Sequence, residues 1–207
     1  MPLSYFQCSE CGQCFEPDQV TYNCLTCGGN LDAHFSFEEN SKEIDQNGIL
    51  QSNEPSIWRY APLLAAPDPG FNQTPLHQVG WTPVYQLESL RENLGMRELW
   101  IKDESRNPSA SFKDRASALV VARAIEADIQ TIIAASTGNA GAAMACMAAS
   151  VGKHAVIIAP RSAPPAKVAQ LLTFGAQVVL VDGSYDQAFD LSIEASHELG
   201  WYNRNTG

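Results

Sequence analysis

Short apolar runs separated by polar turns mark the second half of the chain. Residues 98–104 alternate between apolar and polar positions, which is typical of a strand with one exposed face. Three later runs are apolar at almost every position, as expected of strands covered on both faces. They span 131–136, 154–160 and 177–183. Residues 201–207 are predicted to begin a further strand.

Helices are predicted in the intervals between these runs. The intervals carry helix start and stop signals, such as prolines at the first turn of one helix and a glycine after its end. The predicted helices span 112–127, 140–152, 164–175 and 184–200. Strands and helices that alternate in this order favour an α/β fold, a parallel sheet with helices on both faces. Ligands of such sheets bind at the carboxyl ends of the strands, where the turn 136–139 lies.

Composition divides the chain into three zones. Residues 1–34 are rich in cysteine and glycine and have little capacity for an apolar core, so a small separate module is predicted there. Residues 35–80 mix acidic residues with prolines and are predicted to form an extended connector that begins the large domain, with one short helix near 54–65. Residues 81–207 carry the α/β pattern.

The overall balance of residues is that of a globular enzyme, with 45% hydrophobic and 17% charged residues. The formal net charge of −10 opposes binding to nucleic acid and to anionic membrane surfaces, so neither is expected as a partner. No apolar run approaches the roughly 20 residues that span a bilayer. The first residues lack the order of a secretion signal, and a cytoplasmic location is therefore expected.

Two Cys-x-x-Cys-Gly units lie in the first zone. Cys8 and Cys11 form one pair, and Cys24 and Cys27 form the other. Each unit places two thiolates on one side of a tight turn, and the glycine after it allows the left-handed backbone that the turn needs. Together the four cysteines predict a tetrahedral zinc site. Because all four positions are filled by protein, the zinc is expected to be structural.

Two other interpretations of the cysteines stay open. In the first, the four thiols are reduced and hold no metal. In the second, Cys14 extends the first pair to Cys-x-x-Cys-x-x-Cys, which is part of an iron–sulfur pattern whose fourth cysteine and following proline are missing here. Outside the zinc set, Cys14 is predicted to be a half-buried packing residue, and Cys146 is predicted to pack within a helix.

Two polar segments at predicted helix starts carry candidate chemistry. Lys113 opens one helix, where the positive end of the helix dipole favours a neutral amine that can attack an aldehyde. A lysine in Lys-Asp-Arg is also commonly a solvated surface charge. Residues 136–141, Ser-Thr-Gly-Asn-Ala-Gly, offer hydroxyls and free backbone N–H groups to an anion. The same residues also suit a simple helix cap.

Taken together, these segments resemble the tryptophan synthase β-like (fold type II) family of pyridoxal-phosphate (PLP) enzymes. The resemblance covers about 80 to 207 and rests on short motifs of this sequence. They are Gly-Trp-Thr-Pro-Val at 80–84, Lys-Asp-Glu at 102–104 before Asn107-Pro108, Ser-Phe-Lys-Asp-Arg at 111–115 and Ser-Thr-Gly-Asn-Ala at 136–140. An amino-terminal zinc ribbon occurs in some threonine synthases, and the order of ribbon and motifs is most similar to that branch.

The resemblance implies PLP as cofactor, with Lys113 as the catalytic residue that holds it and later moves protons at the substrate carbons. Phe112 would form the wall beside the PLP ring, and Asn139 would hydrogen-bond the 3′-oxygen of the ring. The implied activity is that of threonine synthase, a carbon–oxygen lyase that converts O-phospho-L-homoserine and water to L-threonine and phosphate. The cofactor is needed because its ring stores the charge of a carbanion.

For the substrate, the resemblance implies that Ser136, Thr137 and Gly138 hold the carboxylate and that Asn203 helps to bind the phosphate. One departure bears on this assignment. Many threonine synthases have a threonine that often touches the substrate phosphate where this chain has Ala140. Serine/threonine dehydratase-like and cysteate synthase-like members of the family therefore stay as alternatives. So does a function of another class, a zinc-ribbon binding module on a catalytically silent α/β domain.

The family pattern also extends further than this sequence. The glycine-rich loop that binds the PLP phosphate and the polar residue that faces the pyridine nitrogen normally come later than Gly207. The chain is therefore expected to be the amino-terminal half of a longer protein and to have little or no activity by itself. Relatives are commonly dimers, so a homodimer that acts on a small amino-acid substrate is expected for the full-length protein.

Overall fold

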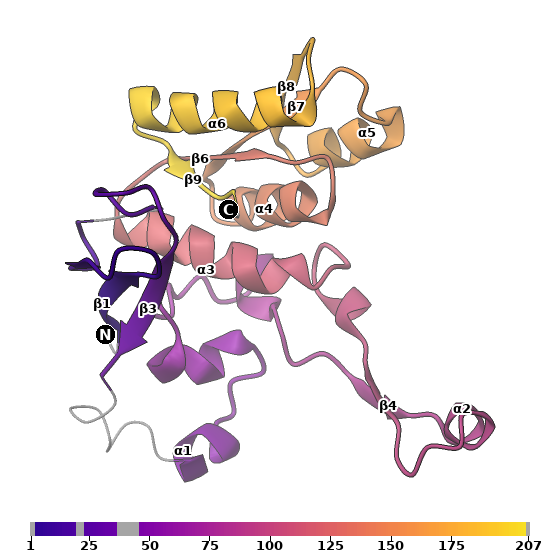
Figure 1. The fold of residues 1–207 in the computed structure, drawn as a ribbon. Helices are drawn as coiled ribbons and strands as arrows, with labels where there is room; N and C mark the ends of the chain where they lie inside the picture. Colours follow the sequence, from indigo (N-terminus) through magenta and orange to yellow (C-terminus); the bar gives the residue numbers. More distant parts are fainter. Residues whose placement is uncertain (1–2, 20–22, 37–45, 206–207) are drawn as a thin grey trace.

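A small antiparallel sheet forms the amino-terminal part of the protein, whose computed structural model describes residues 3–19, 23–36 and 46–205 (Figure 1). We refer to residues 3–19 and 23–36 as the ribbon. Its strands are β1 (Leu3–Cys8), β2 (Cys14–Phe15) and β3 (Leu31–Phe35), in the order β2-β1-β3. Cys8, Phe15 and Cys24 are the buried residues of the ribbon core. So small a core stabilises a module weakly unless further bonds are added.

The connector predicted over 35–80 contributes to the main core of the protein. The part that the structure describes contains α1 (Gln46–Gln51) and the 3-10 helices η1 (Ile57–Leu63) and η2 (Pro75–Gln78). The helix expected near 54–65 is present as η1, which Ser56 caps by accepting a hydrogen bond from Trp58 N at 3.2 Å. Trp58 and Leu76 are buried in the main core, so this segment is packed. The part of the connector before α1 lies outside the described residues.

An arm, residues 84–102, projects from the rest of the protein at the lower right of Figure 1. It consists of β4 (Val84–Gln86), α2 (Glu88–Asn93) and β5 (Trp100–Lys102), with β4 and β5 paired antiparallel. Every residue of both strands is exposed, and no residue of α2 is buried. The strand predicted over 98–104 is shorter than expected, because β5 covers only Trp100–Lys102. It is exposed on both faces, because neither face of the hairpin is covered by the described residues.

A four-stranded parallel sheet is the centre of the fold. Its strands are β6 (Thr131–Ala135), β7 (His154–Pro160), β8 (Gln177–Val181) and β9 (Tyr202–Asn203), in the order β8-β7-β6-β9. Its helices are α3 (Lys113–Glu126), α4 (Asn139–Ala149), α5 (Pro165–Thr173) and α6 (Tyr185–Leu199), and the 3-10 helix η3 (Glu104–Arg106) precedes α3. The predicted α/β fold with a parallel sheet is confirmed. No helix in the described ranges is long and apolar enough to cross a membrane.

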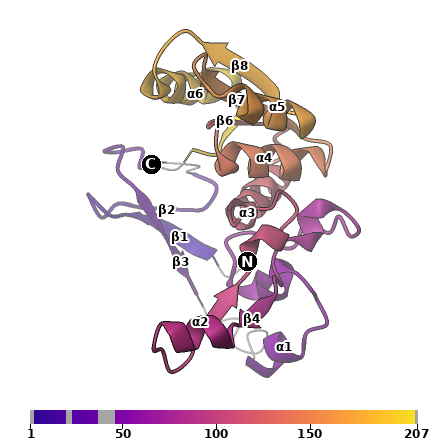
Figure 2. The same cartoon turned by 90° about the vertical axis from the view of Figure 1, so that its right-hand side faces the viewer.

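Different helices cover the two faces of this sheet. Ile132 and Ile157 belong to the core shared with α3, α4 and α5, whereas Ile133 and Ile158 pack with Ala188 of α6. Neighbouring residues of a strand point to opposite faces, which explains why these strands are apolar at every position. In both views α4 lies between the sheet and α3, so α4 is covered on two sides (Figures 1 and 2).

The small residues of α4 suit this enclosed position. Ala143, Met144 and Met147 are fully buried, and the helix approaches the loop before it closely. A Cβ on Gly141 would lie only 2.7 Å from the backbone oxygen of Ser136. Only glycine fits there without displacing the loop, so α4 and the end of β6 are packed as one unit.

Candidate active site and metal centre

The hydroxyl of Ser136 holds the loop after β6. Its Oγ accepts hydrogen bonds from the backbone N–H groups of Gly138 and Gly141, each at 3.2 Å. These bonds turn the chain from the end of β6 into the first turn of α4. A serine hydroxyl that accepts two bonds still has its own proton to donate, so Ser136 can also face an anion.

The residues after Ser136 are accessible. Gly138 and Asn139 are exposed, and Thr137 is half-buried. Asn139 is the first residue of α4, so it stands beside backbone N–H groups that have no partner within the helix. The helix dipole adds a partial positive charge at the same end. The loop therefore offers the donors, the exposure and the field that an anion requires.

Lys113 is the first residue of α3, and its side chain is exposed. The Oγ of Ser111 accepts a hydrogen bond from the Lys113 N–H at 3.1 Å, which fixes the start of the helix. The Nζ of Lys113 lies 5.9 Å from the centre of the Phe112 ring, and 59% of Phe112 is exposed. An amine and an aromatic ring are thus presented together at one helix start.

A buried carboxylate anchors the segment before Lys113. Asp114 is fully buried, and it accepts hydrogen bonds from the Ser109 N–H, at 2.7 Å, and from the Ser109 hydroxyl. Burial raises the pKa of Asp114, and the two bonds from Ser109 oppose that shift. This pair closes the loop that turns into α3 and so determines where Lys113 emerges.

Arg115 forms a two-point ion pair with Glu104. Its Nε donates to Oε2 and its Nη2 donates to Oε1, each at 2.9 Å. These bonds outweigh the effect of burial and, with further bonds from Asn107 and Thr82, lower the pKa of Glu104 to about 2. The pair ties the first turn of α3 to the 3-10 helix that precedes it.

Glu104 is also the centre of a polar cluster that includes the Gly-Trp-Thr-Pro segment. Thr82 Oγ1 donates to Glu104 Oε1 at 3.0 Å, and Asn107 Nδ2 donates to Oε2 at 2.8 Å. Asn107 Oδ1 in turn accepts from Gly80 N–H at 2.9 Å. Gly80 has a φ of +94°, and a Cβ there would lie 2.5 Å from the Ile57 side chain. The glycine is therefore required by backbone conformation and by space.

These contacts give structural roles that sequence reasoning missed. The segments 80–84 and 102–107 contribute to the family resemblance, yet the sequence alone assigns them no role. In the structure they brace the start of α3. The sequence feature that could have indicated this role is the pair of opposite charges, at positions 104 and 115, on either side of the helix start.

The structure brings the starts of α3 and α4 to one end of the sheet. The two helices pack against each other, and both begin on the right-hand side of Figure 1, where β6 also ends. Lys113 and Asn139 therefore lie at the same end as the Ser136 loop, and both are exposed. This end holds the carboxyl termini of the parallel strands, where ligands of α/β sheets bind.

Asn203 lies in β9, and its side chain is engaged within the protein. It is 8% exposed, and its Oδ1 accepts a hydrogen bond from Asn205 N–H at 2.7 Å. Asn205 reaches the end of β6, because its Oδ1 accepts from Ala135 N–H at 2.8 Å. A cavity of about 50 Å³ beside it is also lined by Ser136, Tyr185 and Arg204. Sequence reasoning singled out Asn203 and missed Asn205, although both follow the apolar start of the same predicted strand.

The four cysteines predicted as metal ligands form one cluster. Their Sγ atoms, from Cys8, Cys11, Cys24 and Cys27, all lie within 4.8 Å of one another. Two of the pairs are Cys8–Cys27 at 3.5 Å and Cys11–Cys24 at 3.6 Å. A tetrahedral zinc ion with bonds of about 2.3 Å requires sulfurs about 3.8 Å apart. The cluster therefore fits a zinc ion.

Both halves of the cluster are built as the same turn. The first sulfur of each unit, that of Cys8 and that of Cys24, accepts hydrogen bonds from backbone N–H groups of its own turn at 3.4 to 3.5 Å. Gly12 and Gly28 follow the units with φ of +73° and +76°, the left-handed conformation predicted for them. N–H groups aimed at sulfur favour the thiolate form that binds metal.

The pKa values of two thiols in the cluster are shifted in opposite directions. Burial disfavours the Cys24 thiolate, but the N–H groups of Cys27 and Thr26 outweigh it and lower the pKa of Cys24 to about 6. The Gly29 N–H favours the Cys27 thiolate, yet the neighbouring sulfurs of Cys11 and Cys8 raise the pKa of Cys27 to about 12. A cation among the sulfurs would relieve this mutual repulsion, and four soft ligands suit zinc.

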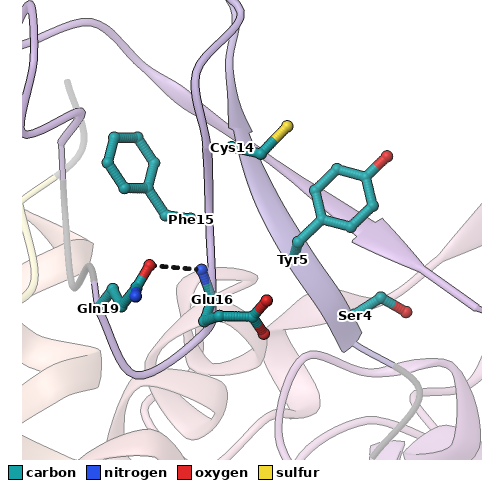
Figure 3. Close-up of a pocket in the computed structure, with 6 residues that line it drawn as sticks. All are labelled: Ser4, Tyr5, Cys14, Phe15, Glu16 and Gln19. Atoms are coloured by element: carbon teal, nitrogen blue, oxygen red, sulfur yellow. Dashed lines mark hydrogen bonds between the residues drawn. The ribbon is translucent and has the colours of Figure 1, made fainter.

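Cys14 lies outside the cluster and is exposed. The prediction that it is half-buried is wrong, because alternate residues of β2 point to opposite faces and Phe15 occupies the buried one. An open hollow of about 400 Å³ lies beside it (Figure 3). Its lining residues are Ser4, Tyr5, Cys14, Phe15, Glu16 and Gln19. Cys146, in contrast, packs against the main core as predicted.

Sequence comparison relates the α/β part to one family of proteins. The family model described as pyridoxal-phosphate dependent enzyme matches residues 76–207. The threonine synthase of Methanosarcina acetivorans is 37% identical over 190 residues, which are 91% of this chain and 45% of the relative. That of Methanocaldococcus jannaschii is 33% identical over 201 residues, 97% of this chain and 49% of the relative. The chain therefore spans about half the length of these relatives.

Two further similarities concern a shorter part of the chain. The biosynthetic L-threonine dehydratase of Haemophilus influenzae is 36% identical over 118 residues, 56% of this chain and 23% of the relative. Among solved structures, that of O-ureido-L-serine synthase superposes with a TM-score of 0.55 at 25% identity. The superposition covers 64% of this chain and 43% of that chain.

Proposed function

Because the chain belongs to the pyridoxal-phosphate dependent enzymes, we propose that it is the amino-terminal half of a threonine synthase. Its reaction would convert O-phospho-L-homoserine and water to L-threonine and phosphate. The observation that carries the proposal is an amine, Lys113, at the same end of the sheet as the anion-binding loop that begins at Ser136. Matches to two threonine synthases over 91% and 97% of the chain favour this branch of the family.

The residues at this end of the sheet fit PLP. Lys113 supplies an exposed primary amine, the group that links an aldehyde cofactor to a protein. Phe112 supplies an exposed aromatic face beside that amine, and Asn139 supplies an amide that can hydrogen-bond the ring oxygen. Bound PLP would take up the electron pair of a substrate carbanion, which protein side chains cannot do.

The protein's own groups would orient the substrate and move its protons. The hydroxyls of Ser136 and Thr137, with the backbone N–H groups from Gly138 onward, would donate hydrogen bonds to the substrate carboxylate. The amine of Lys113 would remove and return protons at the substrate carbons. Asn203 would act on the substrate phosphate through its amide nitrogen, because its amide oxygen already accepts a hydrogen bond within the protein.

In this proposal the ribbon holds one structural zinc ion. The four cysteine sulfurs fill all four positions of a tetrahedral ion, which leaves none for water or substrate. The bonds to zinc would supply the stability that the three buried residues of the ribbon core do not. The ribbon, over most of residues 1–34, would therefore be a separate folding module ahead of the catalytic fold.

The proposed activity requires more polypeptide than this chain contains. The chain covers 45% and 49% of its two threonine synthase relatives. The exposed apolar side chains of the arm, such as Leu94 and Trp100, would be covered by the remaining polypeptide. We therefore expect the 207 residues alone to bind PLP weakly and to turn over little substrate. The homodimer and the cytoplasmic location belong to the same proposal for the full-length protein.

The proposal is tested on the longest native form of the protein, purified with PLP, beside two lysine variants. Lys113→Ala should lack the visible absorbance band of a lysine-bound cofactor and should release no phosphate from O-phosphohomoserine. Lys167→Ala is the matched control, because Lys167 is also exposed in the first turn of a helix, α5, and it should keep both properties. A band that survives in Lys113→Ala, or no band in the parent, would contradict the proposal.

A dehydratase is the second candidate function. Ala140 stands where many threonine synthases have a threonine that often touches the substrate phosphate, and the chain is 36% identical to a threonine dehydratase over 118 residues. The same preparations distinguish the two reactions. Ammonia formed from threonine or serine, without phosphate release from O-phosphohomoserine, would assign the protein to the dehydratase branch.

A further inference from the structure

Arg123 lies where three parts of the protein meet. It belongs to the last turn of α3. Its Nη2 donates a hydrogen bond of 3.2 Å to the backbone oxygen of Pro17 in the ribbon, across 106 positions of sequence. Its Nη1 lies 2.7 Å from Glu126 Oε2 on the same helix. Its charge also lies near the side chain of Tyr202 in β9, where it opposes the rise in pKa that burial causes. One guanidinium therefore contacts the ribbon and α3 and lies near the edge strand of the sheet.

The ribbon side of this contact is a closed turn. Pro17 follows β2 in a turn where Gln19 N–H donates to Glu16 O at 3.0 Å. Glu16 N–H returns a bond of 3.0 Å to Gln19 Oε1, so the turn is closed from both ends (Figure 3). Phe15, directly before the turn, packs with two of the metal-site cysteines in the ribbon core. The position of the Pro17 oxygen therefore depends on the order of the metal site.

The sheet side of the contact leads to the candidate active site. Tyr202 pairs with Ile132 of β6 and packs against the main core. Burial raises the pKa of its hydroxyl, and the neighbouring Arg123 opposes that shift. Tyr202 begins the short edge strand β9, which runs directly into Asn205 beside the Ser136 loop. A group that fixes Tyr202 therefore also fixes the strand that leads to Asn205.

We propose that Arg123 is a positioning residue that couples the metal-binding ribbon to the β9 edge of the sheet. The ribbon has few buried side chains, so its folding depends on metal. It presents the Pro17 oxygen to Arg123 only when it is folded. Bound metal thus holds Arg123 beside Tyr202 and stabilises β9. The inference rests on the zinc site of the proposed function and adds a second role to that zinc, the ordering of a sheet edge.

Such coupling acts in both directions. If bound metal favours the position of Arg123 near Tyr202, then loss of the arginine weakens metal binding by the same factor. The side chain of Arg123 is 19% exposed, and hydrogen bonds to charged groups shielded in this way change equilibria by a factor of roughly 10. A change of that size is measurable by titration with Co²⁺, whose visible spectrum reports tetrahedral thiolate ligation.

The test uses the longest native form of the protein and two arginine variants. Arg123→Gln removes the charge, and Arg91→Gln is the matched control because Arg91 pairs with Glu92 on the arm. In the parent and the control, Co²⁺ should slow hydrogen exchange of the β9 amides. In Arg123→Gln, Co²⁺ should still give the four-thiolate spectrum but bind roughly tenfold more weakly, and exchange at β9 should no longer respond to metal. Arg123→Lys keeps the charge but not the planar guanidinium. Its Co²⁺ affinity should lie between those of the parent and Arg123→Gln.

Three outcomes would overturn the coupling. If all chains bind Co²⁺ equally and β9 exchange in Arg123→Gln still responds to metal, the ribbon and the sheet do not communicate through Arg123. If exchange in Arg123→Gln rises equally in α4 and β7, the residue stabilises the whole fold and has no specific positioning role. If the parent gives no thiolate spectrum with Co²⁺, the zinc site itself is refuted, and the coupling with it.

Discussion

The guanidinium of Arg115 binds the carboxylate of Glu104 through two hydrogen bonds, each 2.9 Å long. The two side chains are 25% and 22% exposed, so water screens the pair only in part. Arg115 lies in the first turn of α3 together with Lys113. The ion pair therefore fixes the turn that carries the proposed cofactor-binding amine.

Replacement of the acidic partner should weaken the fold. We expect Glu104→Gln to lower the free energy of unfolding by about 2 kcal/mol, because Arg115 then keeps a partly buried charge with a weaker acceptor. Urea denaturation at neutral pH measures the change. Glu92→Gln is the control, since Glu92 is 69% exposed in its pair with Arg91 and should change stability little. Equal effects of the two substitutions would contradict the expectation.

The same carboxylate predicts a pH dependence of stability. The pKa of Glu104 is about 2 in the folded protein, against roughly 4.3 in an unfolded chain. A lowered pKa means that the contribution is complete above the unfolded value and is lost as the pH falls toward the folded value. Between about pH 5 and about pH 2 the parent should therefore lose more stability than Glu104→Gln. If the free energies of unfolding of the parent and of Glu104→Gln change equally with pH, the expectation is refuted.

Two glycines next to the Ser136 loop should respond differently to alanine. A Cβ on Gly141 would lie 2.7 Å from the Ser136 backbone oxygen, whereas the nearest atom to a Cβ on Gly138 is Ser136 Oγ at 4.0 Å. Gly138 also has an ordinary φ of −101°. We expect Gly141→Ala to lower the free energy of unfolding by about 2 kcal/mol. Gly138→Ala should stay within about 0.5 kcal/mol of the parent in thermal unfolding.

Removal of one ribbon sulfur should release the metal. Cys24→Ser deletes a buried member of the four-cysteine cluster, so elemental analysis should find far less zinc than in the parent. Cys14→Ser is the control, because Cys14 is exposed and outside the cluster. Treatment of the parent with a chelator should reproduce the loss of ribbon structure seen in Cys24→Ser. Full zinc content in Cys24→Ser would mean that the ion binds elsewhere.

The arm should make the isolated chain self-associate. Trp100 and Leu94 are 58% and 59% exposed, and within the described residues no further strand pairs with the two-stranded sheet of the arm. Sedimentation at rising protein concentration should show oligomers that Trp100→Gln reduces. Leu25→Gln is the control, because Leu25 is 72% exposed but lies on the ribbon. An equal reduction by both changes would remove the arm as the cause.

The sheet and its helices could be predicted because their signals are local. Strands such as β6 and β7 are apolar at successive positions, and α6 begins with a capping box formed by Ser184 and Gln187. The exposure of the arm could not be predicted in this way. Alternation in 98–104 indicates a strand but carries no information about which segment covers it.

The sequence also predicted only those residues of the candidate site that have a local signal. Lys113, Ser136 and the four cysteines stand out because each lies at a helix start or within a short repeated turn. Asn205 and Arg123 have no such signal. Their partners lie 70 and 106 positions away, at Ala135 and Pro17, and contacts over such distances leave no pattern in a single sequence. Only the fold reveals them.

With the proposed zinc bound, the ribbon would also set an order of events during synthesis. Its sulfur contacts span at most 19 positions between Cys8 and Cys27, whereas Pro17 meets Arg123 over 106 positions. Ribosomes add roughly 5–20 residues per second, so α3 emerges about 5 to 20 seconds after the ribbon. The nascent chain could therefore bind its metal first, pack α3 against the folded ribbon second, and add β9 to the sheet last. The amino-terminal module would then act as a template on which a later segment is laid.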